Sequence, residues 1–230
     1  LLTHMSGLTY DFMYRTNVDA AYRKTKVQQA ESLKDFVDIL SKLPLEFSPG
    51  DKWNYSVSTD VLGYLVEVLS GMELEDYFKK YIFTPLEMND TSFSCPKNKL
   101  DRLCSLYEHD PVGIPKLLEI PFLNTRMASG GGGLFSTMHD YHNFCHMLLH
   151  DGEFEGKRII GRKTLELMTT NHLPDNQDLT EMSESAFSET PYAGVGFGLG
   201  FSVMLDPAKS QSVSDIGEFG WGGAASTVFM

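Results

Sequence analysis

The stretch Trp53-Asn54-Tyr55-Ser56-Val57-Ser58-Thr59-Asp60-Val61-Leu62-Gly63 is the most informative part of this chain. The apolar residues at its end and just after it recur at helical spacing: Val61, Leu62, Leu65, Val66 and Leu69. This spacing predicts an amphipathic helix, with Thr59 or Asp60 as its N-terminal cap and Ser70-Gly71 at its end. Tyr55 would then lie just before the helix, near the positive end of its dipole. A phenol placed there can exchange its proton with a hydroxyl nucleophile.

Other segments of the sequence also carry a clear period. Apolar residues at helical spacing predict four more helices, at about 31–43, 73–82, 138–150 and 161–170. Ser136 or Thr137 is the expected cap of the third of these. Near the end of the chain the spacing of the apolar residues becomes that of β-strands, which are predicted at 198–205 and 225–230.

Helices first and antiparallel strands last indicate an α+β fold. The polar segment 171–190 should be a loop, and 91–125 a long wrapping loop with short strands. We divide the chain into a mainly helical part, residues 1–190, and a part with the strands of a sheet, residues 191–230. Both would belong to one integrated domain.

Composition narrows the classes of function. Hydrophobic residues make up 42% of the 230 positions, as in a globular protein. The 19 basic and 31 acidic residues give a net charge of −12, which disfavours nucleic acid as a partner. No apolar run in the sequence is long enough to cross a bilayer. Both chain ends look cut rather than natural, so the compartment stays open.

Three other patterns suggest sites, and a structural interpretation is favoured for each. Gly130 to Gly133 lack the Gly-Lys-Ser/Thr of a phosphate loop, and a tight turn into the next helix is expected. Four histidines should form a solvated helix face rather than a metal site: His139, His142, His146 and His150. Three cysteines, an odd number, favour buried thiols in a reduced, cytoplasmic setting, with Cys145 in the core.

Two more segments accompany the tyrosine motif and complete a family resemblance. They are Leu1-Leu2-Thr3-His4-Met5-Ser6-Gly7-Leu8 and Gly220-Trp221-Gly222-Gly223-Ala224. Together the three segments resemble the serine β-lactamase-like hydrolases, which include class C β-lactamases, penicillin-binding proteins and related esterases. The Trp-Gly-Gly version is most similar to the carboxylesterase branch. The resemblance implies a β-lactamase-like fold, an α-rich lobe packed on an antiparallel sheet, with the sheet incomplete at both ends of this chain.

The resemblance also implies roles for particular residues. Tyr55 matches the general base, which works with the Lys of a Ser-x-x-Lys motif to deprotonate the serine and then protonates the leaving group. Ala224 matches a position whose backbone N–H helps to bind the oxyanion. Trp221, Gly222 and Gly223 match the substrate-binding strand. No cofactor and no metal is implied.

Two departures from the β-lactamase pattern point to a different substrate. Val57 stands where those enzymes have an asparagine that contacts the acylamino side chain, and valine has neither donor nor acceptor. Trp221 stands where they have a lysine that attracts a carboxylate. The substrate-binding positions Val57 and Trp221 therefore favour a neutral, small-molecule ester or amide over a β-lactam.

The nucleophile is expected outside these 230 residues. The chain contains one Ser-x-x-Lys, Ser94-Cys95-Pro96-Lys97, but it follows the tyrosine and lies in a segment that proline keeps from being helical. We treat it as a coincidence and predict that the chain alone is inactive. The parent protein would be a carboxylesterase-like serine hydrolase that forms an acyl-enzyme. The alternatives are a β-lactamase or D,D-peptidase, a transacylase, or a non-catalytic ligand-binding relative, and the oligomeric state is open.

Overall fold

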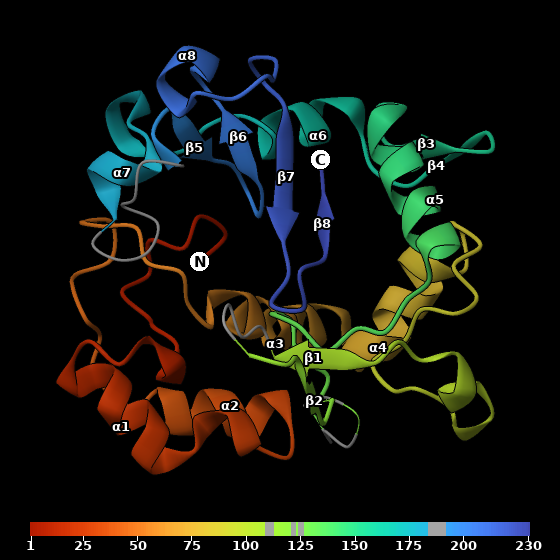
Figure 1. Cartoon of the computed structure of the whole chain (residues 1–230), viewed down its shortest axis with the longest axis horizontal. Helices are drawn as coiled ribbons and strands as arrows, with labels where there is room; N and C mark the ends of the chain where they lie inside the picture. Colours follow the sequence, from red (N-terminus) through yellow and green to blue (C-terminus); the bar gives the residue numbers. More distant parts are fainter. Residues whose placement is uncertain (109–112, 121–122, 124–126, 184–191) are drawn as a thin grey trace.

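The computed structural model describes residues 1–108, 113–120, 123, 127–183 and 192–230. Helices surround a small sheet, and the N-terminus lies between the sheet and the helices α1 to α3 (Figure 1). The α-helices are α1 Asn17–Thr25, α2 Leu33–Leu40, α3 Ser58–Ser70, α4 Leu74–Phe78, α5 Met138–Leu149, α6 Arg162–Met168, α7 Leu179–Met182 and α8 Pro207–Ser210. A single π-helical turn, Lys79–Phe83, extends α4.

The sheet is antiparallel and has four strands in the order β5-β6-β7-β8. They are β5 Val195–Phe197, β6 Ser202–Met204, β7 Phe219–Gly222 and β8 Val228–Phe229. Two separate hairpins pair β1 Leu106–Glu108 with β2 Lys116–Leu118, and β3 Glu153–Phe154 with β4 Lys157–Arg158. The expected α+β fold, with an α-rich part packed on an antiparallel sheet, is confirmed.

Helix α3 ends where its sequence predicts, but it begins with a different cap residue. Gly71 ends it as predicted, with a left-handed φ of 67° that favours glycine. The predicted cap is wrong, because the helix starts at Ser58 and Val57 occupies the cap position. Asp60 is instead buried in the first turn, where its carboxylate accepts hydrogen bonds from Ser129 Oγ at 2.5 Å and Gly131 N at 3.2 Å.

The other predicted helices are present, although shorter than expected. Thr137 is the cap of α5, since its hydroxyl accepts a hydrogen bond from the backbone N–H of Asp140 at 3.1 Å. The buried side of α5 carries Asp140, Asn143, Met147 and Leu148. Cys145 is therefore only half-buried, not a core residue as predicted, and burial still raises the pKa of its thiol.

The strands and the polar loop differ more from expectation. Strand β6 covers only part of 198–205, because Gly200 adopts a φ of 105° in the turn that follows β5. Strand β8 covers only part of 225–230. The segment 171–190 contains α7, which begins with a capping box formed by Asp178 and Glu181. Residues 184–190 of that segment lie outside the described residues.

Two clusters of buried side chains meet at Tyr55. The first joins the N-terminal segment, α7 and the sheet through Met5, Trp53, Leu173, Leu179, Met182, Val195 and Phe197. The second joins the N-terminal segment to α1, α2 and the start of α3 through Leu8, Tyr10, Tyr22, Val27, Phe36, Leu40 and Val57. Tyr55 packs against both. Leu173, Leu179 and Met182 precede residue 190 but pack against side chains of the sheet. The division of the chain into residues 1–190 and 191–230 stays a prediction.

Within the described residues, no helix is both long and apolar enough to span a membrane.

Candidate active site

Four aromatic rings surround the side chain of Tyr55, which lies just before α3. The centroid of its ring is 5.0 Å from that of Tyr10, 5.1 Å from His4, 5.4 Å from Trp221 and 6.5 Å from Trp53. These rings come from the N-terminal segment, the turn before α3 and strand β7. Tyr55 and Trp221 are more than 160 positions apart in the sequence and are thus neighbours only through the fold.

Trp221 reaches this place from β7. Its register pairs it with Phe229 of β8, and its ring meets that of Phe197 edge-on, with centroids 5.3 Å apart. The indole and the phenol of Tyr55 are in direct contact rather than separated by a cleft. This places an uncharged aromatic surface beside the phenol.

Gly222, Gly223 and Ala224 follow Trp221 into an exposed turn. Strand β7 ends at Gly222, so the prediction that Gly223 also lies on the strand is wrong. The turn closes through Gly223 N, which donates to Thr227 O at 2.7 Å. A Cβ on Gly223 would lie 2.2 Å from Thr227 Oγ1, so a larger residue at this position would require the Thr227 side chain to move. Ala224 is exposed in this turn, and its part in binding an oxyanion stays a prediction.

Val57 does not lie where a substrate could reach it. Its side chain is fully buried in the second cluster, between the N-terminal segment and α2. The expectation that Val57 contacts a substrate is therefore not supported by its position. Its burial instead anchors the turn that carries Tyr55.

A chain of buried hydroxyls fixes the backbone beside Tyr55. His4 Nδ1 is 3.3 Å from Ser56 Oγ, Ser56 Oγ is 2.8 Å from Ser58 Oγ, and Ser58 Oγ is 2.7 Å from Ser6 Oγ. The backbone N–H of Ser56 also donates to His4 Nδ1 at 3.3 Å, so that nitrogen acts as an acceptor. Burial lowers the pKa of His4 to about 4. His4 is thus neutral at pH 7.

A second polar cluster lies on the other side of the tyrosine and was missed in the sequence. Tyr10 is buried, and its ring lies beside that of Tyr55, with centroids 5.0 Å apart. Burial first, then the charges of Tyr55 and Asp60, raises the pKa of Tyr10 far above its usual value. Glycine at 131 makes this convergence possible, because a Cβ there would lie within 3.0 Å of oxygens of Tyr10, Thr59 and Asp60.

The neighbouring Gly130 has a related role. A Cβ at this position would lie 2.2 Å from the carbonyl oxygen of Thr59 and 3.2 Å from Gly63 N. The glycine run therefore packs its backbone against the start of α3. It serves as the structural turn expected from the sequence, with Gly133 at a φ of 85°.

The one Ser-x-x-Lys segment is unlike a nucleophile site. Ser94 is exposed and precedes a 3₁₀ helix that begins at Lys97, so the two residues do not share an α-helical turn. The geometry agrees with the interpretation of a coincidence.

The histidines of α5 are not a uniformly solvated face. His146 is half-buried, and its ring meets Phe154 edge-on with centroids 5.8 Å apart. It also stacks on His150, with centroids 4.0 Å apart. In the part of the chain that the structure describes, no group of three or more His, Cys, Asp or Glu side chains could hold a metal ion.

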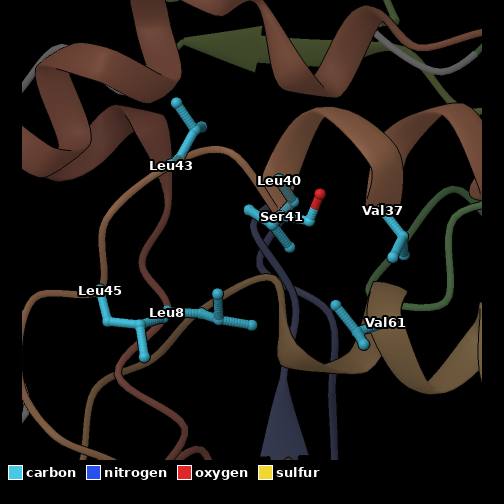
Figure 2. Close-up of a pocket in the computed structure, with 7 residues that line it drawn as sticks. All are labelled: Leu8, Val37, Leu40, Ser41, Leu43, Leu45 and Val61. Carbon is cyan, nitrogen blue, oxygen red and sulfur yellow. The ribbon is translucent and has the colours of Figure 1, made fainter.

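A cavity of about 340 Å³ lies between α2, the start of α3 and the segment after α2 (Figure 2). Its lining is apolar except for Ser41, and consists of Leu8, Val37, Leu40, Ser41, Leu43, Leu45 and Val61. Because it offers no titratable side chain, we place the candidate chemistry at Tyr55 and not here.

The chain is similar to known proteins over nearly its whole length. Protein Rv1367c of Mycobacterium tuberculosis is 34% identical over 99% of this chain and 57% of its own length. Esterase EstB of Burkholderia gladioli is 27% identical over 97% of this chain and 58% of its own. The solved structure of EstCE1, described as a hydrolase with promiscuous acyltransferase activity, superposes with a TM-score of 0.76 and 24% identity, over 96% of this chain and 60% of that one.

The chain thus spans a little under three-fifths of the length of these two curated relatives. The family model described as Beta-lactamase matches residues 1–230, the whole of the chain. With its antiparallel sheet, its helices and the Tyr55–Trp221 contact, the chain belongs to the Beta-lactamase family.

Proposed function

We propose that this chain is part of a carboxylesterase-like serine hydrolase that acts on neutral esters through an acyl-enzyme. The observation that carries the proposal is the contact between Tyr55 and Trp221, with ring centroids 5.4 Å apart. This contact supports the proposal because a phenol, which can exchange a proton, would act there beside an apolar surface. The likeness to an esterase over nearly the whole chain supports the same class of reaction.

In this mechanism a serine from outside residues 1–230 attacks the ester carbonyl. The tyrosine takes the serine proton while the Ser–carbon bond forms, and the carbonyl π electrons move to oxygen. The backbone N–H of Ala224 donates to that oxyanion, an interaction often worth a few kcal/mol. Tyr55 then returns the proton to the leaving alcohol as the ester bond breaks. Water then attacks the carbonyl carbon of the acyl-enzyme and gives its proton to Tyr55, which returns that proton to the serine oxygen as the serine–carbon bond breaks and the acid is released.

The proposed substrate follows from the groups beside the phenol. A lysine at position 221 would attract a carboxylate, whereas the indole of Trp221 offers an uncharged, apolar face. This favours neutral acyl or alcohol groups over β-lactams and peptide C-termini, and no cofactor takes part.

Transfer of the acyl group to an alcohol is a close second candidate. The observation that favours it is the likeness to a hydrolase with promiscuous acyltransferase activity. The acyl-enzyme is common to both reactions, so the acceptor alone distinguishes them. A β-lactamase, a D,D-peptidase and a non-catalytic ligand-binding relative remain the other candidates.

The test uses the protein expressed with its flanking coding sequence, beside the 230-residue chain. We expect the longer protein to hydrolyse p-nitrophenyl butyrate and to be labelled at a serine by a fluorophosphonate probe. The shorter chain should do neither, and Ser94→Ala should leave the longer protein's activity unchanged. A longer protein that is folded but neither labelled nor active would favour the ligand-binding relative. Labelling that is lost with Ser94 would overturn the assignment of the nucleophile.

A further inference from the structure

The backbone on both sides of Tyr55 is hydrogen-bonded to a single residue of the N-terminal segment, His4. The N–H of Asn54, just before the tyrosine, donates to His4 O at 3.0 Å. The N–H of Ser56, just after the tyrosine, donates to His4 Nδ1 at 3.3 Å. Because peptide groups are planar, a hydrogen bond on each side of a residue limits how its side chain can be directed. The proposed mechanism uses Tyr55 but gives His4 no task.

The backbone conformation of His4 lets it make both of these bonds. Its φ is 55°, a left-handed conformation that few residues other than glycine adopt. The N–H of His4 donates to Leu1 O at 3.0 Å and closes this turn of the chain. The carbonyl oxygen and the ring of His4 thereby both reach the turn that carries Tyr55. A strained conformation of this kind persists where the surrounding structure holds it in place.

Close packing fixes the orientation of the His4 ring. Its centroid is 5.1 Å from that of Tyr55, 5.5 Å from Phe197 and 5.7 Å from Trp53. The residue is only 3% exposed, so the ring has little room to turn. Ser56 Oγ also lies 3.3 Å from His4 Nδ1. This nitrogen is therefore held facing the backbone beside the tyrosine.

The protonation state of His4 suits an acceptor. Burial lowers the pKa of the ring to about 4, so the imidazole is neutral at pH 7. A neutral imidazole has one acceptor nitrogen and one N–H. Because Nδ1 accepts from the N–H of Ser56, the proton of the ring lies on Nε2.

We propose that His4 is a positioning residue for Tyr55: its carbonyl oxygen and its Nδ1 hold the backbone N–H groups on either side of the tyrosine and so set the place of the phenol. The inference rests on the proposed function, in which Tyr55 moves the proton. A general base must lie within hydrogen-bond reach of the proton that it takes, so a small displacement of the turn slows the reaction. His4 acts through the turn and takes no proton itself.

The first test needs no catalysis and determines the tautomer of His4 in the 230-residue chain. The histidine rings are labelled with ¹⁵N, and the signals of His4 are identified by their loss in His4→Asn. At pH 7, long-range ¹H–¹⁵N spectra should show a proton on Nε2 and a hydrogen-bonded acceptor at Nδ1. A proton on Nδ1 is incompatible with the inference, because that nitrogen could not then accept from Ser56.

Amide hydrogen exchange on the same chain tests the bond to Ser56. Asparagine and leucine are similar in size and shape, but only asparagine has an acceptor. The Ser56 N–H should therefore exchange about tenfold faster in His4→Leu and much less so in His4→Asn. The Asn54 N–H is the internal control, because its acceptor is a backbone carbonyl that both variants keep. Unchanged exchange at Ser56 in His4→Leu would overturn the inference.

Enzyme kinetics link the inference to activity in the longer protein. With p-nitrophenyl butyrate, His4→Leu should lower kcat by about 10–100-fold and leave KM within about threefold of the wild type. His4→Asn should recover most of the rate, because it restores an acceptor. His4→Gly adopts a φ of 55° without strain but has no acceptor, and it should be as slow as His4→Leu. His139→Asn, at an exposed position, should keep the wild-type rate.

The outcomes separate this inference from the proposed function. If the longer protein has no esterase activity, the proposed function fails, while the tautomer and the exchange rates still decide whether His4 holds the turn of Tyr55. In an active protein, a folded His4→Leu variant with the wild-type kcat would refute the role of His4. A His4→Asn variant as slow as His4→Leu would refute it too, since the acceptor would then make no difference.

Discussion

A variant without the imidazole of His4 should lose about 2 kcal/mol less stability than the wild type between pH 7.5 and pH 5. The ring of His4 is buried among those of Trp53, Tyr55 and Phe197 at centroid distances of 5.1–5.7 Å. Its Nδ1 accepts a hydrogen bond from the backbone N–H of Ser56. Protonation would both bury a charge and remove this acceptor.

The size of the effect follows from the shift in pKa. Burial lowers the pKa of His4 from 6.5 to about 4 in the folded chain, a difference of about 3 kcal/mol at full extent. A depressed pKa means that the unfolded chain binds the proton more readily. The stability that His4 contributes is therefore complete above pH 6.5 and is lost as the pH falls towards 4. About 2 kcal/mol should be lost between pH 7.5 and pH 5.

The variant His4→Asn suits this experiment. His4 has a positive φ of 55°, which asparagine adopts more readily than most residues, and an asparagine side chain keeps an acceptor near Ser56 N. The free energy of unfolding is measured in urea at pH 7.5 and at pH 5, with His139→Asn, an exposed position, as the control. Wild type and the control should lose about 2 kcal/mol more than His4→Asn over this range. An equal loss in all three proteins would refute the reasoning.

Three further predictions concern the loop, a cap and the pocket. Gly131→Ala should lower the free energy of unfolding by about 1–3 kcal/mol through overpacking, whereas Gly161→Ala, whose nearest contact is at 3.4 Å, should cost far less in the same urea titration. Asp178→Asn should lower the free energy of unfolding by about 1–2 kcal/mol, because Asp178 caps α7, pairs with Lys209 and accepts a hydrogen bond from Gly194 N. In thermal melts, Asp206→Asn, at an exposed helix cap, should lower the stability less. Trp221→Lys should reduce kcat/KM for p-nitrophenyl butyrate about tenfold and should raise kcat/KM for an anionic ester. Equal effects on the two esters would contradict the proposed pocket.

The sequence revealed the parts of the site that rest on local patterns. Tyr55 stands beside a turn and a strongly periodic helix, and Trp221 lies in a glycine-rich strand, so both could be located from their neighbours in the chain. The contact between them, with centroids 5.4 Å apart, agrees with the family resemblance. The α+β class was also predictable, because the spacing of the apolar residues changes along the chain from that of helices to that of strands.

Tertiary contacts explain what the sequence did not reveal. Asp60 looked like a helix cap, but it bonds Ser129 and Gly131 from a loop almost seventy residues away. Val57 looked like a pocket residue because of its place in the motif, yet its side chain fills the core. Tyr10 has no local signal at all, because its partners come together only through the fold.

Some of the missed elements did carry a readable signal. The sequence Asp178-x-x-Glu181 is a capping box, and it begins α7 within a segment predicted to be a loop. Strand β5 has only three residues and contains Gly196, so its period was too short to detect. Gly196 is needed there because a Cβ would lie 2.5 Å from the side chain of Asn171.

The rate of Tyr55→Phe in the longer, active protein tests most directly whether this phenol moves the proton. With p-nitrophenyl butyrate, kcat should fall by about 10²–10⁴-fold, as when a general base is removed, while the fold is unchanged by circular dichroism. Tyr14→Phe, at an exposed ring that contacts Arg23, should keep the wild-type rate. A Tyr55→Phe protein that turns over at the wild-type rate would show that the chemistry lies elsewhere.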